Sequence, residues 1–496
     1  MISMKKAIIL FICLALSFNM DSRVCAKTKA KDAEKAKKAM LANPAIKHID
    51  ANTTKYDKIQ KQIWSYAEVG FHEFKSSALL QQTLREGGFS VQSGMADMPT
   101  AFIAEYGSGK PVIGILAEFD ALPGLSQDTV SRRKVLNEGQ PGHGCGHNLI
   151  CTGSVAAALS LKEWIDKTGT SCTIRLFGTP AEEGGSGKAY MARAGLFNGV
   201  DAMLDWHPGQ KQKVYVNPWL DRVSMDVRFY GKPAHASAHP EDGRSALDAA
   251  EAFTHMLNMM REHVPEACAI SYIYSNGGAA ENVVPDFASI DLGARAPSQA
   301  QLKDLLAWIR QAAEGAALGT QTRVELEVIS SSMSKLHNRT LATLLQEKLE
   351  LVGLPQWDER EIAFAREIYE TQSKARPFEN IYSILPLEPE MAHGTSSSSD
   401  VGDVTWLVPD GGFETQTFIP STSGHSWQNV AVAGSTIGTK GLIIAAKVIA
   451  LAAIELIQNP ALLQKAQDEF YSRRGPDFKY EPLIGDRLPP YDYQLK

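Results

Sequence analysis

Three short apolar segments of this chain read as buried β-strands, and acidic or imidazole side chains follow each of them. A near-continuous apolar run is typical of a parallel strand that is covered on both faces. The strands and the groups after them are Val112–Phe119 with Asp120, Cys172–Phe177 with Glu182 and Glu183, and Ala202–Trp206 with His207. Because the loops after parallel strands meet at one edge of a sheet, the pattern predicts an α/β fold with its site at that edge.

A fourth loop of the same kind is Pro141–Asn148, which holds one thiol and two imidazoles separated by glycines. Cys145 and His147 are sulfur and nitrogen ligands that suit zinc, manganese or cobalt better than calcium. Glycine lets the backbone turn sharply, so that several donors can converge on one point. Taken alone, the loop reads equally well as a glycine-rich turn with incidental polar residues. The matching loops elsewhere in the chain favour a metal site.

The order of segments predicts two domains, as expected for a chain of 496 residues, which is more than one core usually serves. Residues 27–216 and 332–496 alternate strands and helices and predict a doubly wound, mostly parallel sheet. Residues 217–331 predict an inserted α+β domain of the ferredoxin-like β-α-β-β-α-β order. Its elements are expected at Arg222–Tyr230, Ser245–His263, Ala269–Tyr274, Ala288–Ala294, Gln299–Leu318 and Arg323–Ile329.

The N-terminus has the composition of a secretory signal peptide. Two lysines precede an apolar run over Ala7–Phe18, which is too short to span a bilayer, and small residues follow up to Ala26. We therefore predict a signal peptide over residues 1–26 and an exported mature chain. Lipid attachment to Cys25 and an uncleaved N-terminal anchor are the alternatives, and mass spectrometry of the mature N-terminus separates them.

Composition excludes several other classes of protein. A net charge of −6 gives no basic excess of the kind that nucleic-acid binding requires. No internal repeat and no membrane-spanning segment is apparent in the sequence. Six cysteines, two of them in the export segment, do not form the disulfide framework of a small secreted protein. The tail after Pro476 is rich in proline and tyrosine, and we expect it to wrap the surface.

Together, these motifs resemble one enzyme family over roughly residues 50 to 475. The motifs are Glu118–Pro123, the Cys145/His147 loop, Pro180–Gly185, His207-Pro208, and Gly231–Gly243 with His235. The chain is similar to the di-metal amidohydrolases related to aminoacylases, glutamate carboxypeptidase and the plant auxin-conjugate hydrolases. Further motifs, including Gly243–Asp248, Ser399–Val404 and His425 followed by Trp427, are most similar to the p-aminobenzoyl-glutamate hydrolase branch of that family.

This resemblance implies a two-metal centre. Two divalent ions, zinc or manganese and alternatively cobalt, would be held by a mixed set of donors, and the family pattern leaves His143 outside it. The ligands implied are Cys145, His147, Glu183, His207 and His425. One thiolate, three imidazoles and one carboxylate leave room for water, which suits a catalytic site. Asp120 is expected to orient a ligand histidine, and Glu118 either shares that task or only packs.

The resemblance also implies roles in catalysis and substrate binding. Glu182 is the expected general base, although both glutamates could bind metal instead. His235, in the inserted lid and dimerisation domain, is expected to reach the active site of another subunit and stabilise the oxyanion. Arg295 is expected to bind the substrate carboxylate, with a surface arginine as the alternative, and Asn282 to assist at the oxyanion or at the carboxylate. Beyond these, His239 is expected at the surface, and Asp400 and Thr395 in pocket loops.

The implied activity is hydrolysis of an amide between an acyl group, expected to be aromatic, and an amino acid. The alternatives are a dipeptidase or an N-acyl-amino-acid deacylase of the same fold, or a non-catalytic subunit. An export signal is unexpected beside the cytoplasmic p-aminobenzoyl-glutamate enzyme, in which a B-type chain works with a related A-type chain. A homodimer acting outside the cytoplasm is therefore the expected assembly, with an A-type partner as the alternative.

Overall fold

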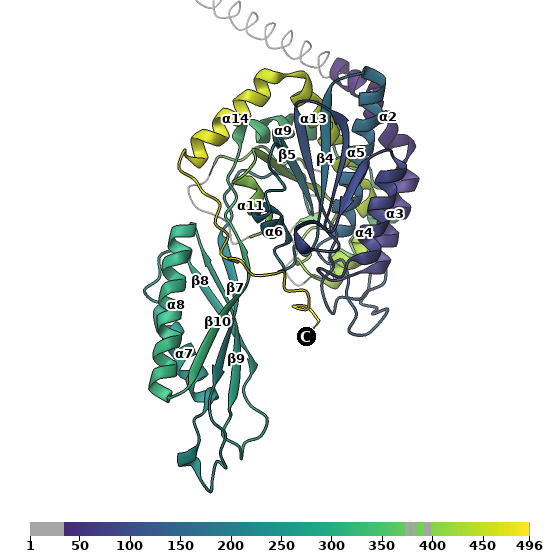
Figure 1. The fold of residues 1–496 in the computed structure, drawn as a ribbon. Helices are drawn as coiled ribbons and strands as arrows, with labels where there is room; N and C mark the ends of the chain where they lie inside the picture. Colours follow the sequence, from purple (N-terminus) through teal and green to yellow (C-terminus); the bar gives the residue numbers. More distant parts are fainter. Residues whose placement is uncertain (1–33, 373–376, 379–382, 391–397, 496) are drawn as a thin grey trace, which may run out of the picture.

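The structure is a computed structural model that describes residues 34–372, 377–378, 383–390 and 398–495. The predicted signal peptide lies outside these residues. Within them, the larger sheet has seven strands in the order β1-β2-β4-β3-β5-β11-β6 (Figure 1). Their bounds are β1 Ser90–Ser93, β2 Phe102–Ser108, β3 Val112–Glu118, β4 Cys172–Thr179, β5 Ala202–Gly209, β6 Lys213–Val214 and β11 Asp410–Gln416.

The centre of this sheet is parallel, and its edges are antiparallel. Strands β4, β3, β5 and β11 run in the same direction. On one side β2 runs against them and β1 pairs antiparallel with β2, and on the other side β6 runs against β11. All seven residues of β3 are buried, as expected for a strand covered on both faces. The mostly parallel α/β sheet is therefore as predicted, with β1, β2, β6 and β11 as strands that the sequence analysis did not identify.

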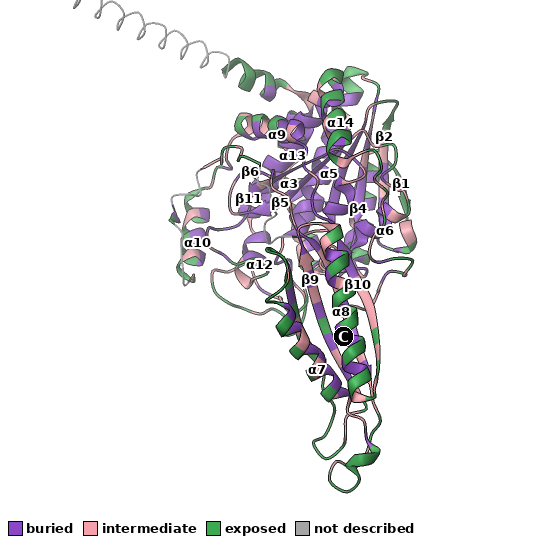
Figure 2. Cartoon of the chain, turned by 90° about the vertical axis from the view of Figure 1, so that its left-hand side faces the viewer, coloured by how far each residue is buried: buried purple, intermediate pink, exposed green. Residues whose placement is uncertain are grey.

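Two long apolar helices pack together against this sheet: α5, His147–Thr168, and α13, Thr436–Gln458. They lie in the buried centre of the domain (Figure 2). By length and composition, α13 is the one helix of the described residues that could cross a membrane, but 83% of its apolar window is buried, as in the core helix of a folded domain. The other helices are α2 Pro44–Ala51, α3 Thr53–Tyr66, α4 Phe74–Glu86, α6 Gly187–Arg193, α9 Arg339–Val352, α10 Glu359–Glu370, α11 Val401–Thr405, α12 Trp427–Ala433 and α14 Pro460–Arg474.

A second sheet extends from the first and has its own hydrophobic core. Its strands, in the antiparallel order β10-β7-β9-β8, are covered on one face by α7 and α8. The bounds are β7 Asp221–Tyr230, α7 Ala246–Met260, β8 Ala269–Asn276, β9 Phe287–Ala296, α8 Gln299–Thr320 and β10 Arg323–Ser332. This unit, here called the small domain (residues 221–332), has the β-α-β-β-α-β order expected for residues 217–331.

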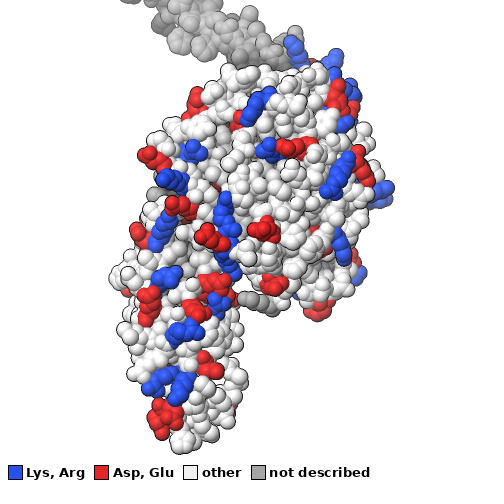
Figure 3. All heavy atoms as spheres, in the orientation of Figure 1, with Lys and Arg blue, Asp and Glu red and all other residues white. Residues whose placement is uncertain are grey.

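The C-terminal tail (residues 475–495) leaves α14, passes the small domain and ends against the large one, where Figure 1 draws it in yellow. Leu483 packs against the core of the small domain, while Ile484 and Tyr493 belong to a hydrophobic cluster of the large domain. The tail therefore follows the surface of both domains. On the face shown in Figure 3, basic side chains lie among acidic ones instead of forming one basic patch.

Candidate metal centre

The predicted ligands converge at the carboxyl-end edge of the parallel strands. Their donor atoms form three overlapping groups, and within each group the atoms lie within 4.8 Å of one another. The groups are Cys145 with His147 and His207, Cys145 with Glu183 and His425, and His147 with Glu182 and Glu183. All five predicted ligands are therefore brought together, and Cys145 belongs to two of the groups.

The backbone around the ligands adopts conformations that the sequence must accommodate. Gly146, directly before α5, has a φ of +82°, and a Cβ there would lie 2.9 Å from Pro208 and 3.0 Å from Phe418. Only glycine fits this turn, which places His147 at the first position of α5. Ala181 and His425 also have positive φ values, 57° and 55°. Such strain persists only where the surrounding structure holds it, and it is common at functional sites.

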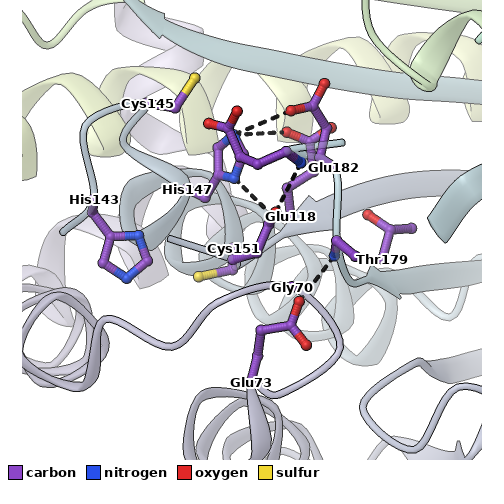
Figure 4. Close-up of polar contacts among 12 residues, drawn as sticks. Gly70, Glu73, Glu118, His143, Cys145, His147, Cys151, Thr179 and Glu182 are labelled. Carbon is purple, nitrogen blue, oxygen red and sulfur yellow. Dashed lines mark hydrogen bonds and ion pairs between the residues drawn. The ribbon is translucent and has the colours of Figure 1, made fainter. Parts of the chain in front are cut away.

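Asp120 connects two of the ligands. Its Oδ1 lies 2.9 Å from His147 Nδ1, and its Oδ2 accepts a hydrogen bond of 2.9 Å from the backbone N–H of Glu183. A carboxylate behind a metal-binding histidine fixes the tautomer of the ring and frees the other nitrogen. Figure 4 shows the His147 ring among these groups, facing the acidic side chains. This is the geometry expected of a residue that orients a ligand histidine.

Two atoms of the site are buried without a hydrogen-bond partner: His147 Nε2 and Glu183 Oε1. A buried polar atom left unpaired costs free energy, and coordination to a cation would satisfy both of these atoms. Cys145 supplies a soft sulfur donor beside them, with its Sγ 3.4 Å from His207 Nε2. A divalent cation of the zinc, manganese or cobalt type therefore fits the residues present.

The electrostatics of the site favour a cation for a second reason. Burial, together with the charge of Glu182, raises the pKa of Glu183 to about 8. Burial, together with the charge of Glu183, raises the pKa of the Cys145 thiol. Crowded acidic groups away from water resist ionisation, because each charge repels the next. A bound cation supplies the opposite charge and reverses this effect.

A buried lysine, Lys188, lies behind the site. Its Nζ is 2.7 Å from Glu118 Oε1 and 2.6 Å from Asp400 Oδ1, and all three side chains are buried. Burial alone would raise the pKa of Glu118, but the charges of Lys188 and His147 outweigh it and lower that pKa. Glu118 Oε2 lies 3.5 Å from His147 Nε2, so Glu118 also faces the ligands. Asp400 therefore belongs to a buried ion pair with Lys188. Thr395, the other residue expected in a pocket loop, lies outside the described residues.

A cavity of about 500 Å³ opens beside the ligands. Arg295 lines it, and so does Arg222, which the sequence analysis missed. The two arginines are direct cross-strand partners on β7 and β9. Burial and the charge of Arg222 lower the pKa of Arg295. Lys213, Tyr215, Trp219 and Glu414 are among the other residues that line the cavity.

Three other candidates lie apart from this cavity. His143 is buried with its Nε2 3.2 Å from the carbonyl of Ile63, and burial lowers its pKa to about 3. Its ring lies away from the ligand group (Figure 4), in agreement with its exclusion as a ligand. His235 and Asn282 are exposed neighbours in the small domain, where Ala236 N donates to the carbonyl of Asn282 at 3.0 Å. Neither lines the cavity of its own chain.

Comparisons with known proteins agree with this site. Residues 114–374 match Peptidase family M20/M25/M40. The chain is 37% identical over 446 residues to the B-type subunit of p-aminobenzoyl-glutamate hydrolase from Escherichia coli (strain K12), covering 85% of this chain and 93% of that protein. It is 28% identical over 446 residues to the Xaa-Arg dipeptidase of Mus musculus, covering 87% and 92%.

Among solved structures, a dinuclear metal-binding peptidase of the M20 family from Bacillus subtilis has the same fold. The TM-score is 0.50 at 18% sequence identity, and the match covers 81% of this chain and 99% of that one. The family match covers more than half of this chain, and the metal-binding donors lie where the fold brings its loops together. The chain belongs to Peptidase family M20/M25/M40, and it is a metal-dependent hydrolase of amide bonds.

Proposed function

We propose that this enzyme cleaves the amide between an aromatic acyl group and an acidic amino acid, as in p-aminobenzoyl-glutamate. The observation that carries the proposal is the Arg222–Arg295 pair in the cavity beside the converging ligands. The E. coli relative, named for that substrate, supports the same choice.

Five residues would hold two divalent cations, with zinc or manganese, and alternatively cobalt, as the metals. They are Cys145, His147, Glu183, His207 and His425. When bound, such a pair supplies Lewis acidity that activates water and polarises the amide carbonyl. Cys145, His147 and Glu183 each belong to two of the three ligand groups. Asp120 holds His147 in the orientation that ligation requires.

Glu182 would carry the proton in this reaction. Its carboxylate lines the cavity, and its Oε2 lies 3.9 Å from His147 Nε2. Burial and the charge of Glu118 raise the pKa of Glu182, which brings it closer to the value a general base needs at neutral pH. Glu182 would take a proton from the attacking water at its carboxylate oxygen. It would then deliver that proton to the nitrogen of the leaving amino acid.

The two arginines favour an acidic leaving group. Like charges directly opposite each other on a sheet are destabilising, so an anion between Arg222 and Arg295 would relieve their repulsion. Guanidinium groups match carboxylates with two parallel hydrogen bonds. The same charges disfavour the arginine side chain of an Xaa-Arg dipeptide. Tyr215 and Trp219, whose ring centres lie 5.8 Å apart, line the same cavity and offer an aromatic surface to the acyl group.

The assembly we propose is a homodimer in which His235, assisted by Asn282, completes the site of the other subunit. Its support is that both residues are exposed and lie outside the cavity of their own chain. The alternative is an A-type partner chain, because the E. coli relative is designated a subunit. The signal-peptide composition of residues 1–26 supports an exported enzyme.

The proposed substrate class is tested on metal-reconstituted protein. We expect kcat/KM for p-aminobenzoyl-glutamate to exceed that for p-aminobenzoyl-glutamine, hippurate and a dipeptide ending in arginine. Arg222→Gln should lower the value for the glutamate conjugate by about 10- to 100-fold, the usual effect of losing a charged hydrogen bond. The control is Arg228→Gln, which removes a β7 arginine paired with Glu327. Equal turnover of all four compounds, or preference for the arginine peptide, would refute the proposal.

A further inference from the structure

The last residues of the chain contact the backbone of a proposed metal ligand. Tyr493 Oη donates a hydrogen bond of 3.0 Å to the carbonyl of Glu183, and Gln494 Nε2 donates one of 2.8 Å to the same oxygen. The side-chain oxygen of Gln494 in turn accepts a hydrogen bond of 3.0 Å from the N–H of Gly70. The C-terminal tail therefore binds directly to the loop that carries Glu182 and Glu183.

These contacts complete a clamp around Glu183. On one side of the residue, its N–H donates to Asp120, the group that also orients His147. On the other side, its carbonyl accepts from the tail. The backbone next to Glu183 is strained, because Ala181, two residues before it, has a φ of 57°. A strained loop keeps its shape only where its surroundings fix it, and the tail supplies part of that restraint.

The tail fits a site that is shaped to receive it. The ring of Tyr493 packs edge-on against Phe71, with ring centres 5.8 Å apart. A Cβ at Gly70 would lie 2.4 Å from Tyr493 Oη, so the position of this hydroxyl depends on a glycine. Further back along the tail, Arg487 forms a 2.9 Å ion pair with Glu327 and donates to the carbonyl of Val328 at 2.8 Å. The tail is thus anchored on the small domain before it reaches Glu183.

We propose that Tyr493 and Gln494 are positioning residues for the metal centre. By holding the carbonyl of Glu183, they keep its carboxylate aimed at Cys145 and His425, the two other members of its ligand group. This inference rests on the ligand role of Glu183 in the proposed function. Groups that orient a metal ligand typically contribute 10- to 100-fold in metal affinity or activity.

The test compares metal binding of two full-length variants with wild type. Tyr493→Phe combined with Gln494→Met removes both donors and keeps the bulk. Tyr491→Phe is the matched control. It removes a hydroxyl group of the same tail, one that donates to the backbone carbonyl of Asp97 and not to Glu183. Zinc affinity is measured by competition with a chelator, and the thermal midpoint is measured on metal-free protein.

We expect the double variant to lose 10- to 100-fold in zinc affinity at one site, while its metal-free thermal midpoint stays close to that of Tyr491→Phe. Unchanged affinity in the double variant, or an equal loss in Tyr491→Phe, would overturn the proposal. Because the readout is metal binding, failure of the proposed substrate would show separately, as wild-type protein that binds two metals and cleaves none of the conjugates.

Discussion

Glu182 and Glu183 are adjacent in sequence, yet they occupy different surroundings. Glu183 has its backbone held at both ends, and its Oε1 lies 3.5 Å from His425 Nε2. Glu182 belongs to one ligand group, with His147 and Glu183, and both glutamates line the cavity. Glu183 therefore meets two groups of candidate ligands and Glu182 meets one, which supports a ligand role for Glu183 and a proton-transfer role for Glu182.

The variant Glu182→Gln separates these two roles. We expect it to bind the same amount of metal as wild type and to lose about 10²–10⁴ in kcat, because glutamine keeps the shape and cannot accept the proton. Metal content by elemental analysis and turnover of p-aminobenzoyl-glutamate are the measurements. Loss of one equivalent of metal would instead make Glu182 a ligand, and near-normal turnover would remove it from the mechanism.

Residue chemistry also decides what the sequence could predict of the site. Cysteine, histidine and paired glutamates in the loops after apolar strands are informative, because few sites other than metal or catalytic centres use these residues there. Lys188 and Arg222 gave no such signal, since a lysine at the start of α6 and an arginine in an alternating strand are typical of solvent-exposed positions. Only the packing of distant segments shows that Lys188 is buried between Glu118 and Asp400.

At the scale of elements, β11 shows where the fold could not be read from the sequence. Its residues, Asp410–Gln416, include two glycines and a single large apolar side chain, Phe413. A Cβ at Gly412 would lie 2.4 Å from Asp205 and 2.6 Å from the Nζ of Lys335, which itself is buried between Asp205 and Asp410. The neighbours of Gly412 therefore leave no room for the β-branched side chains by which strands are recognised.

Three elements meet at Asp403 of α11, and this junction predicts a pH dependence of stability. Its carboxylate accepts hydrogen bonds from Tyr480 of the tail at 2.7 Å and from the N–H of Met333 after β10 at 3.1 Å. Burial, with a contribution from the charge of Asp221 on β7, raises the pKa of Asp403 from 3.8 to about 7. The folded protein therefore retains a proton that the unfolded chain has lost.

The stability contributed by the protonated Asp403 carboxyl group is fully present below pH 4 and is lost as the pH rises through 7. Asp403→Asn, which stays neutral, should therefore gain thermal midpoint relative to wild type between pH 5 and pH 8. The thermal midpoints of variant and wild type are measured at pH 5 and at pH 8. The control is Asp304→Asn, which makes the same substitution at an exposed position. A difference between variant and wild type that is the same at both pH values would contradict the expectation.

At the scale of the whole molecule, the exposed position of His235 predicts that the active site is shared between subunits. Wild-type dimers would place the His235 of each chain at the cavity of the other. A chain with His235→Ala retains Glu182, and a chain with Glu182→Gln retains His235. A mixed dimer of the two therefore has one intact site, although each parent has none.

Co-expression of the two variants should restore about a quarter of wild-type turnover, because random pairing makes half of the dimers mixed and half of the sites in those dimers intact. Each variant alone is expected to stay inactive and serves as the control. Activity of the mixture no higher than that of its parents would place His235 within its own chain or outside the mechanism.

The position of β11 has a consequence for synthesis on the ribosome. This strand lies between β5 and β6, but it follows them by roughly 200 residues in the chain. Until Asp410–Gln416 emerges from the ribosome, the backbone groups along one edge of β5 lack the strand that pairs with them. The small domain draws its buried core from residues 223–317, so it can fold first, and the host sheet must close around an already structured insertion.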